Sequence, residues 1–214
     1  MDNFFKLLSD IVVYLSWFYP ILYIKGFAKN SKAFKIFTVY LVGIAIVQFL
    51  LYLSNRVLKL DSNLFLFIYY FIFQFLTLSF FYKTLLGYRW IYVVTGIALL
   101  FFGMQYINDP QMYYRYNPLG VTVSQSIIVL YTLLYFYRRL SSKGEFLIVN
   151  VGVFFYLLSS ILIFASGNLV FNLDFPRSTV TMLGRANNIF FFIFQILIMT
   201  EWFRNYFIVK KPID

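Results

Sequence analysis

Seven stretches of this chain are apolar for long enough to cross the hydrocarbon core of a lipid bilayer as helices. A transmembrane helix needs roughly 20 mostly apolar residues. Stretches of about this length lie at 8–24, 36–54, 64–82, 90–107, 119–137, 146–166 and 179–203. Backbone polar groups in lipid must be satisfied within their own segment, and for spans of this length the α-helix does so. The sequence therefore predicts an all-α, polytopic membrane protein with seven transmembrane helices in one bundle.

The segments that separate these stretches are short and contain turn-forming residues, of which Asn108-Asp109-Pro110 is one example. Only 12% of the residues are charged, against about 25% in a soluble domain. We therefore expect a single membrane domain over residues 1–214 and no soluble domain. Pro20 lies inside the first stretch, where we expect it to kink or end the helix.

Basic residues are distributed unevenly between the two ends of the expected helices. The odd-numbered connections and the C-terminal tail hold Lys25, Lys29, Lys32, Lys35, Lys83, Arg89, Arg138, Arg139, Lys143, Arg204, Lys210 and Lys211. The opposite side holds Lys6, Arg56, Lys59, Arg115, Arg177 and Arg185. Because cytoplasmic loops are enriched in Lys and Arg, this distribution predicts the N-terminus outside and the C-terminus inside. We therefore attribute the net charge of +10 to membrane orientation rather than to nucleic-acid binding.

Two groups of basic residues on the predicted inner side are candidates for contact with anionic lipid or an acidic partner protein. These groups are Lys25, Lys29, Lys32 and Lys35, followed by Arg138 and Arg139. The alternative is that they determine topology only. The partners we expect are therefore the lipid bilayer and a membrane or cytoplasmic signalling protein.

The residues that most intramembrane enzymes use are missing from the chain. It has no cysteine and no histidine, which removes thiolate nucleophiles, imidazole bases and histidine-bound metals. All eight acidic residues lie at segment ends, in loops or in tails: Asp2, Asp10, Asp61, Asp109, Glu145, Asp174, Glu201 and Asp214. Proton-coupled transporters typically keep a carboxylate near the bilayer midplane, and none is expected there in this chain, so proton-coupled transport is disfavoured. The missing cysteine and histidine bear on catalysis and metal binding. We therefore expect a non-enzymatic protein without a cofactor or a metal site.

Neutral polar side chains do enter the apolar stretches, most clearly Gln48, Gln74, Gln125 and Ser126. An amide in hydrocarbon requires partners, so we expect the glutamines to face the bundle interior. One interpretation is that they form hydrogen bonds between helices. The other is that they line a cavity for a polar ligand.

A second polar group is expected at the outer mouth of the bundle. Its members are Gln105, Asn108, Asp109, Arg115, Asn117, Asn168, Asn172, Asp174, Arg177, Arg185, Asn187 and Asn188. Arg185 lies about two turns into the last stretch. It is expected to pair with Asp174 or Asp109, or to contact an anionic ligand or lipid headgroup. Among these residues, Asn168, Arg185 and Asn188 are candidate ligand-binding residues.

Three segments are mainly apolar with a few polar positions: Leu64–Lys83, Asn117–Tyr137 and Phe146–Asn168. In these segments the chain resembles small, uncharacterised seven-helix membrane proteins of Bacteroidetes, which are often encoded beside sensor histidine kinases. The clearest motif of the resemblance consists of Phe146, Gly152 and Tyr156. The resemblance implies a signalling accessory protein.

The resemblance also implies glutamates in the second, third and fifth spans, where this chain has Gln48, Gln74 and Gln125. Exchange of glutamate for glutamine keeps the hydrogen-bonding shape and removes the charge. Any proton-linked role of the family is therefore not expected in this chain.

The function we expect is that of a sensor or signalling accessory subunit in a bacterial inner membrane, which binds a small or lipidic ligand or a partner protein. A passive or exchange transporter of a neutral or weakly polar solute is one alternative, and it predicts a water-filled central path. A membrane scaffold or defence-associated protein without a ligand is another, and it predicts no cavity. A closed core with a pocket at the outer mouth favours the sensor.

Overall fold

The computed structural model describes residues 2–59, 65–114, 117–140, 144–172 and 177–207, and no strand occurs among them. The long helices are α1 (Asp2–Gly26), α2 (Lys32–Tyr52), α3 (Phe65–Leu86), α4 (Trp90–Asn108), α5 (Pro118–Arg139), α6 (Leu147–Asn172) and α7 (Arg177–Trp202). Two of them end in π-helical turns, Leu53–Val57 and Phe203–Phe207, and a 3₁₀ turn at Pro110–Tyr114 follows α4. These bounds confirm an all-α fold.

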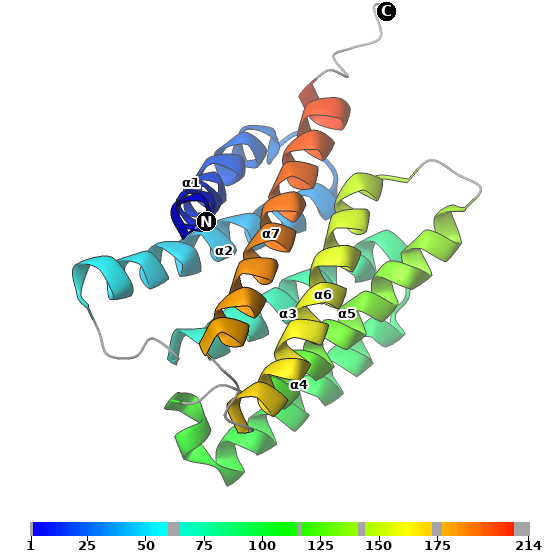
Figure 1. Cartoon of the computed structure of the whole chain (residues 1–214). Coiled ribbons are helices and arrows are strands. Elements are labelled where there is room, and N and C mark those ends of the chain that lie inside the picture. Colours follow the sequence, from blue (N-terminus) through cyan, green and yellow to red (C-terminus); the bar gives the residue numbers. More distant parts are fainter. Residues whose placement is uncertain (1, 60–64, 115–116, 141–143, 173–176, 208–214) are drawn as a thin grey trace, which may run out of the picture.

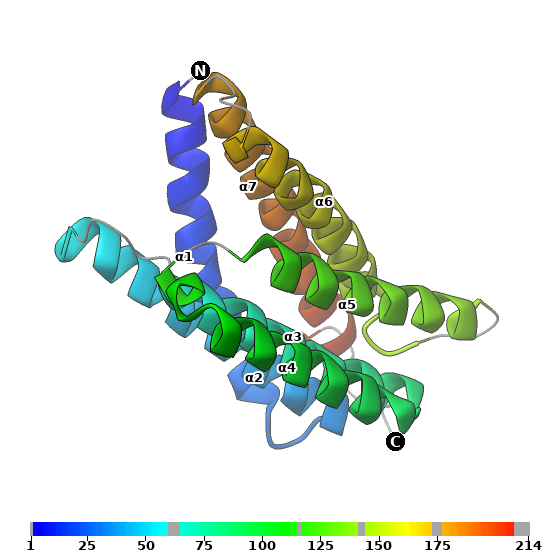
Figure 2. The ribbon, with the colours of Figure 1, turned by 90° about the horizontal axis from the view of Figure 1, so that it is seen from below.

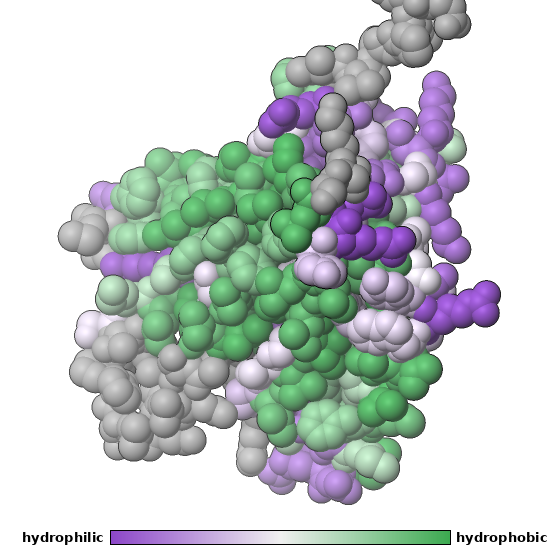
Figure 3. Space-filling model, turned by 90° about the vertical axis from the view of Figure 1, so that its right-hand side faces the viewer, coloured by the Kyte–Doolittle hydropathy of each residue, from purple (hydrophilic) through white to green (hydrophobic). Residues whose placement is uncertain are grey.

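Among the residues that the structure describes, six helices are long and apolar enough to cross a membrane: Asn3–Gly26, Lys32–Tyr52, Phe65–Leu86, Trp90–Asn108, Pro118–Arg139 and Thr181–Phe207. In α6 the stretch Leu147–Ile163 is also apolar but shorter. Apolar side chains cover most of the face shown in Figure 3, and hydrophilic residues lie mainly towards its margins. By length and composition, these helices are those of a multi-pass membrane protein.

The first helix differs from the expectation at both ends. It begins at Asp2 rather than near residue 8, and it continues past Pro20 to Gly26. Proline removes one backbone hydrogen bond, which transmembrane helices tolerate where neighbouring helices and side chains satisfy the freed groups. Of the two effects expected of Pro20, a kink or the end of the helix, the second is therefore wrong.

Six of the helices pack side by side in a closed series, in which α1 contacts α2 and α7, α3 contacts α2 and α5, and α6 contacts α5 and α7 (Figure 1). The remaining helix, α4, packs on the outside of α3 through a stripe that includes Ile91, Thr95, Ala98 and Phe102. We call the end where α1, α3, α5 and α7 begin the amino end, and the opposite end the carboxyl end. In Figure 2, α1, α6 and α7 diverge from α2 and α3 towards the amino end.

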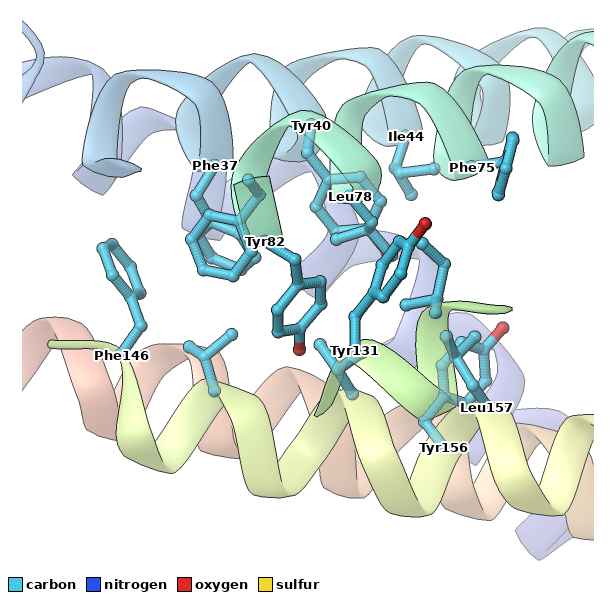
Figure 4. Packing of buried hydrophobic residues seen from close by; sticks show 14 of the residues in the cluster. Phe37, Tyr40, Ile44, Phe75, Leu78, Tyr82, Tyr131, Phe146, Tyr156 and Leu157 are labelled. Atoms are coloured by element: carbon cyan, nitrogen blue, oxygen red, sulfur yellow. The ribbon is translucent and has the colours of Figure 1, made fainter. Parts of the chain in front are cut away.

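The centre of the bundle is filled by a packed layer that consists of Phe37 and Tyr40 of α2 together with Leu78 and Tyr82 of α3. Each of these side chains is at most 2% exposed. Figure 4 shows them between the α2–α3 pair and the α6–α7 pair. The Tyr82 hydroxyl donates to Asn150 Oδ1 of α6 at 2.7 Å, so the layer also joins α3 to α6.

Gly152 allows α6 and α7 to approach closely. A Cβ atom at this position would lie 2.6 Å from Cδ2 of Phe194, a buried ring that stacks on Tyr156 with 5.4 Å between centroids. We expect Gly152→Ala to lower the free energy of unfolding by about 1–3 kcal/mol, as overpacking of a filled core does. The check is unfolding of the purified protein in one detergent.

Gly103 of α4 is the matched control, because a Cβ atom there meets nothing within 4 Å. Alanine favours the helix over glycine by about 0.8–1 kcal/mol, so Gly103→Ala is expected to be neutral or stabilising. Equal effects of the two substitutions would contradict the close packing at Gly152.

Candidate functional site

A cavity of about 260 Å³ lies in the amino-end half of the bundle. Every helix except α4 contributes to its wall. The lining residues are Ser9, Val12, Val13, Gln48, Leu51, Leu66, Phe67, Tyr70, Gln125, Tyr156, Ser160, Asn187, Asn188 and Phe191. None of these side chains carries a formal charge. The cavity is therefore suited to a neutral occupant, because an ion would lose its hydration without gaining a counter-charge.

The cavity brings together three of the residues predicted to bind a ligand: Gln48 from the end of α2, Gln125 from α5 and Asn188 from the start of α7. Gln48 and Asn188, the first and the last of the three in the sequence, are 140 positions apart. They meet because the odd-numbered helices begin, and the even-numbered helices end, at the same end of the bundle. Their use by a ligand stays a prediction.

Three buried polar atoms on the cavity wall have no hydrogen-bond partner among the residues that the structure describes. They are Oε1 of Gln125, Oγ of Ser160 and Oδ1 of Asn187. Gln125 is 3% exposed and Ser160 is fully buried. An unsatisfied buried polar group costs about 1–3 kcal/mol. An occupant of the cavity, either water or a bound molecule, would supply the hydrogen bonds that these three atoms lack.

The predicted residue Gln74 has a different position: it lies next to the cavity, on the side of the carboxyl end. Its Nε2 donates to the hydroxyl of Tyr40 at 3.3 Å and to that of Tyr70 at 3.4 Å. The Tyr70 hydroxyl in turn lies 3.2 Å from that of Tyr156, and both rings line the cavity. Gln74 thus faces the interior as predicted, and its contacts match the interhelical interpretation.

Two other predicted ligand-binding residues, Ser126 and Arg185, are not among the residues that line the cavity. Ser126 is half-buried beside Gln125, and the side chain of Asn168 lies outside the described part of the structure. The Arg185 guanidinium stacks over the Phe5 ring, 4.5 Å from its centroid, and so joins α7 to α1. Its predicted partner Asp174 also lies outside the described residues.

Part of the predicted outer-mouth group forms a local network instead. Asn117 Oδ1 accepts from the backbone N–H of Gly120 at 2.8 Å and caps α5. Its Nδ2 donates to Oε1 of Gln105 at 3.1 Å and contacts the hydroxyl of Tyr106 at 3.4 Å. These contacts fix the connection between α4 and α5, so Gln105 and Asn117 have structural partners.

The carboxyl end contains a buried carboxylate that the sequence analysis did not single out. Glu201 of α7 is fully buried. It accepts backbone N–H groups at the start of α6, from Phe146 at 3.2 Å, Ile148 at 3.0 Å and Val149 at 3.4 Å. Nδ2 of Asn205 donates to the same carboxylate at 2.6 Å. A carboxylate at a helix N-terminus satisfies orphan donors and complements the helix dipole.

Glu145, next to this capped helix start, connects further helices. Its Oε1 accepts from Oγ of Ser31 at 2.5 Å and from the hydroxyl of Tyr206 at 3.1 Å. The Tyr135 hydroxyl donates to its backbone carbonyl. We call Glu145, Phe146 and Glu201 the hub, because they join α2, α5, α6 and α7 at the carboxyl end.

The basic residues predicted to contact lipid or a partner lie at this end. Lys25, Lys29 and Lys32 are exposed, whereas Lys35 is half-buried. Arg138 donates to the carbonyl of Leu86 at the end of α3 and lies 5.6 Å from the ring of Tyr88. Arg139 lies 5.6 Å from the ring of Tyr135.

Within the described part of the chain, no group of three or more acidic, cysteine or histidine side chains is placed to hold a metal ion. The chemistry that the cavity offers is thus hydrogen bonding and apolar contact. Comparison of the chain with protein-family models, with curated proteins and with solved structures gives no match.

Proposed function

We propose that this protein binds a small neutral molecule in the amino-end cavity and acts as a non-enzymatic sensor or signalling accessory subunit. One observation supports ligand binding most directly: Gln125, Ser160 and Asn187 place partnerless polar atoms on one cavity wall. The proposal places the protein in a bacterial inner membrane, as a seven-helix protein with its amino end outside and its basic carboxyl end inside.

A sensor also requires a route from the cavity to the opposite end, and α6 and α7 offer one. Both helices line the cavity, through Ser160 and Asn187. Both also contribute to the hub, where Glu201 of α7 caps the start of α6. An occupant that draws these helices towards α1–α3 would therefore move the hub and the basic surface beside it.

The packed layer argues for a sensor over a solute transporter. A transported solute would have to pass Tyr40, Leu78 and Tyr82, which are 0–2% exposed. The bundle is thus closed between the cavity and the carboxyl end in this conformation.

Mass spectrometry of the purified protein tests ligand binding. The protein is expected to release a small molecule when denatured, and Gln125→Met is expected to retain about tenfold less of it. A lost hydrogen bond of about 1–1.5 kcal/mol corresponds to a change of that size. Gln74→Met is the matched control, because Gln74 is an equally buried amide that does not line the cavity. Protein that carries no molecule, or equal loss in both variants, would contradict the proposal.

Affinity purification from native membranes tests the signalling role. We expect a sensor kinase or response regulator to copurify, and we expect a variant with Lys29→Gln and Lys32→Gln to lose it. Lys6→Gln changes an exposed lysine at the amino end and is the control. Purification without such a partner, or equal loss in the control, would contradict this role.

A further inference from the structure

The cavity has two chemically different walls. The wall formed by α1, α2 and α3 is mainly apolar, with Val12, Leu51 and Phe67 among its residues, and it also includes Ser9, Gln48 and Tyr70. The wall formed by α5, α6 and α7 contains Gln125, Ser160, Asn187 and Asn188. All three of the partnerless polar atoms lie on this second wall, one on each helix. An occupant that matches both walls has an apolar face and a polar edge.

The polar wall also defines which hydrogen-bonding groups the occupant carries. Amide oxygens such as Gln125 Oε1 and Asn187 Oδ1 can only accept hydrogen bonds, and the hydroxyl of Ser160 can accept as well as donate. The polar edge of the occupant must therefore donate hydrogen bonds, and it must present donors to more than one helix.

The charge of the occupant follows from the lining residues. An ammonium group would satisfy the acceptors, but none of the described residues that line the cavity is a carboxylate that would compensate its charge. Transfer of an uncompensated ion into such a site is strongly unfavourable. The volume of about 260 Å³ is below the range of roughly 300–1,000 Å³ that is usual for drug-sized ligands. The occupant is therefore a small neutral group.

We infer that the cavity binds a polyol: a neutral group with two or three hydroxyls along one edge and an apolar face on the other side. This inference rests on the proposed ligand-binding function and specifies its ligand class. A free polyol and the headgroup of a neutral lipid share this chemistry. The hydroxyls donate to Gln125, Ser160 and Asn187, and the apolar face packs on Val12, Leu51 and Phe67.

The test is calorimetric titration of the purified protein, freed of its bound molecule, with three probes that share one ring. Cyclohexane-1,2,3-triol has three donors, cyclohexanol has one, and 2-aminocyclohexanol is charged at neutral pH. We expect the triol to bind at least about tenfold more tightly than either of the others. We also expect Gln125→Met to weaken triol binding more than cyclohexanol binding, and Gln74→Met to leave this difference unchanged.

The outcomes separate the inference from the function on which it rests. If the protein releases a molecule but the triol does not bind, or binds no better than cyclohexanol, the polyol inference is overturned while ligand binding stands. Tightest binding of the amine overturns it too. Protein that releases no molecule and binds no probe overturns both. The mass of the released molecule distinguishes the two sources, because a lipid with a polyol headgroup carries acyl chains that a free polyol lacks. Either source supports the inference.

Discussion

Replacement of Glu201 by alanine is expected to lower the free energy of unfolding by about 3–5 kcal/mol, because each buried donor that loses its acceptor costs about 1–3 kcal/mol. The carboxylate accepts three backbone N–H groups at the start of α6 and the amide of Asn205. The substitution also removes a negative charge from the positive end of the α6 dipole. Denaturant unfolding in detergent measures the effect.

Two further substitutions make this prediction specific. Glu201→Gln keeps one oxygen acceptor and places an amide donor against the other N–H groups, so we expect an intermediate loss. Thr200→Ala is the control, since the hydroxyl of Thr200 donates to the carbonyl of Ile196 within its own helix. It is expected to change stability by less than about 0.5 kcal/mol. A Glu201→Ala variant as stable as Thr200→Ala would show that α6 is not capped in this way.

Phe146→Ala is expected to lower the free energy of unfolding by about 3–5 kcal/mol, the usual range for loss of a buried phenyl ring. The ring is fully buried at the hub. Its centroid lies 5.3 Å from that of Phe37, 5.2 Å from that of Phe81 and 5.6 Å from that of Tyr206. Figure 4 shows Phe146 directed from the start of α6 towards Phe37.

The backbone of Phe146 allows a sharper comparison. Its φ is 62°, in the left-handed region, which costs a residue with a Cβ atom about 1–2 kcal/mol relative to glycine. We therefore expect Phe146→Gly to be more stable than Phe146→Ala by about 1 kcal/mol. In the helical interior of α6, at Phe154, the order should reverse, with alanine favoured by about 1 kcal/mol. The same order at both positions would contradict the left-handed conformation.

The helices could be predicted from the sequence because their signals are local. Apolar runs of sufficient length mark each span, and polar residues cap two of the helices. Ser31 accepts from the N–H of Phe34 at the start of α2, and Asn117 does so from Gly120 at the start of α5. The start of the first helix was predicted too late because Asp2 and Lys6 interrupt its hydropathy without breaking its helical backbone.

The candidate site was predictable only in part. Gln48 and Gln125 stand out because an amide is costly in an apolar span, and the packing of the helices brings both to the cavity. Ser160 gave a weaker signal, because serine is common in membrane helices, and Asn187 was expected only as one of the polar residues at the outer mouth. Their significance comes from the missing partners of their oxygen atoms, which depend on the contacts between helices.

The hub was missed for related reasons. A left-handed backbone at a phenylalanine leaves no mark in the sequence, since glycine is the residue that normally signals it. Glu201 did give a signal: an acidic residue in the last turn of a helix opposes that helix's own dipole. Its burial against the start of α6, 55 positions earlier in the chain, explains this placement.

The closed packed layer below an open cavity is the central claim, and cysteine accessibility tests it most directly. The chain has no cysteine of its own, so single variants can be labelled with a small water-soluble thiol reagent in lipid nanodiscs. The account predicts rapid labelling of Gln48→Cys and Asn188→Cys at the cavity, and protection of Leu78→Cys and Ile198→Cys, whose native side chains are fully buried. Labelling at all four positions would indicate a continuous aqueous path, as a transporter requires. Protection at all four would show that the cavity is not open to water, which contradicts the account.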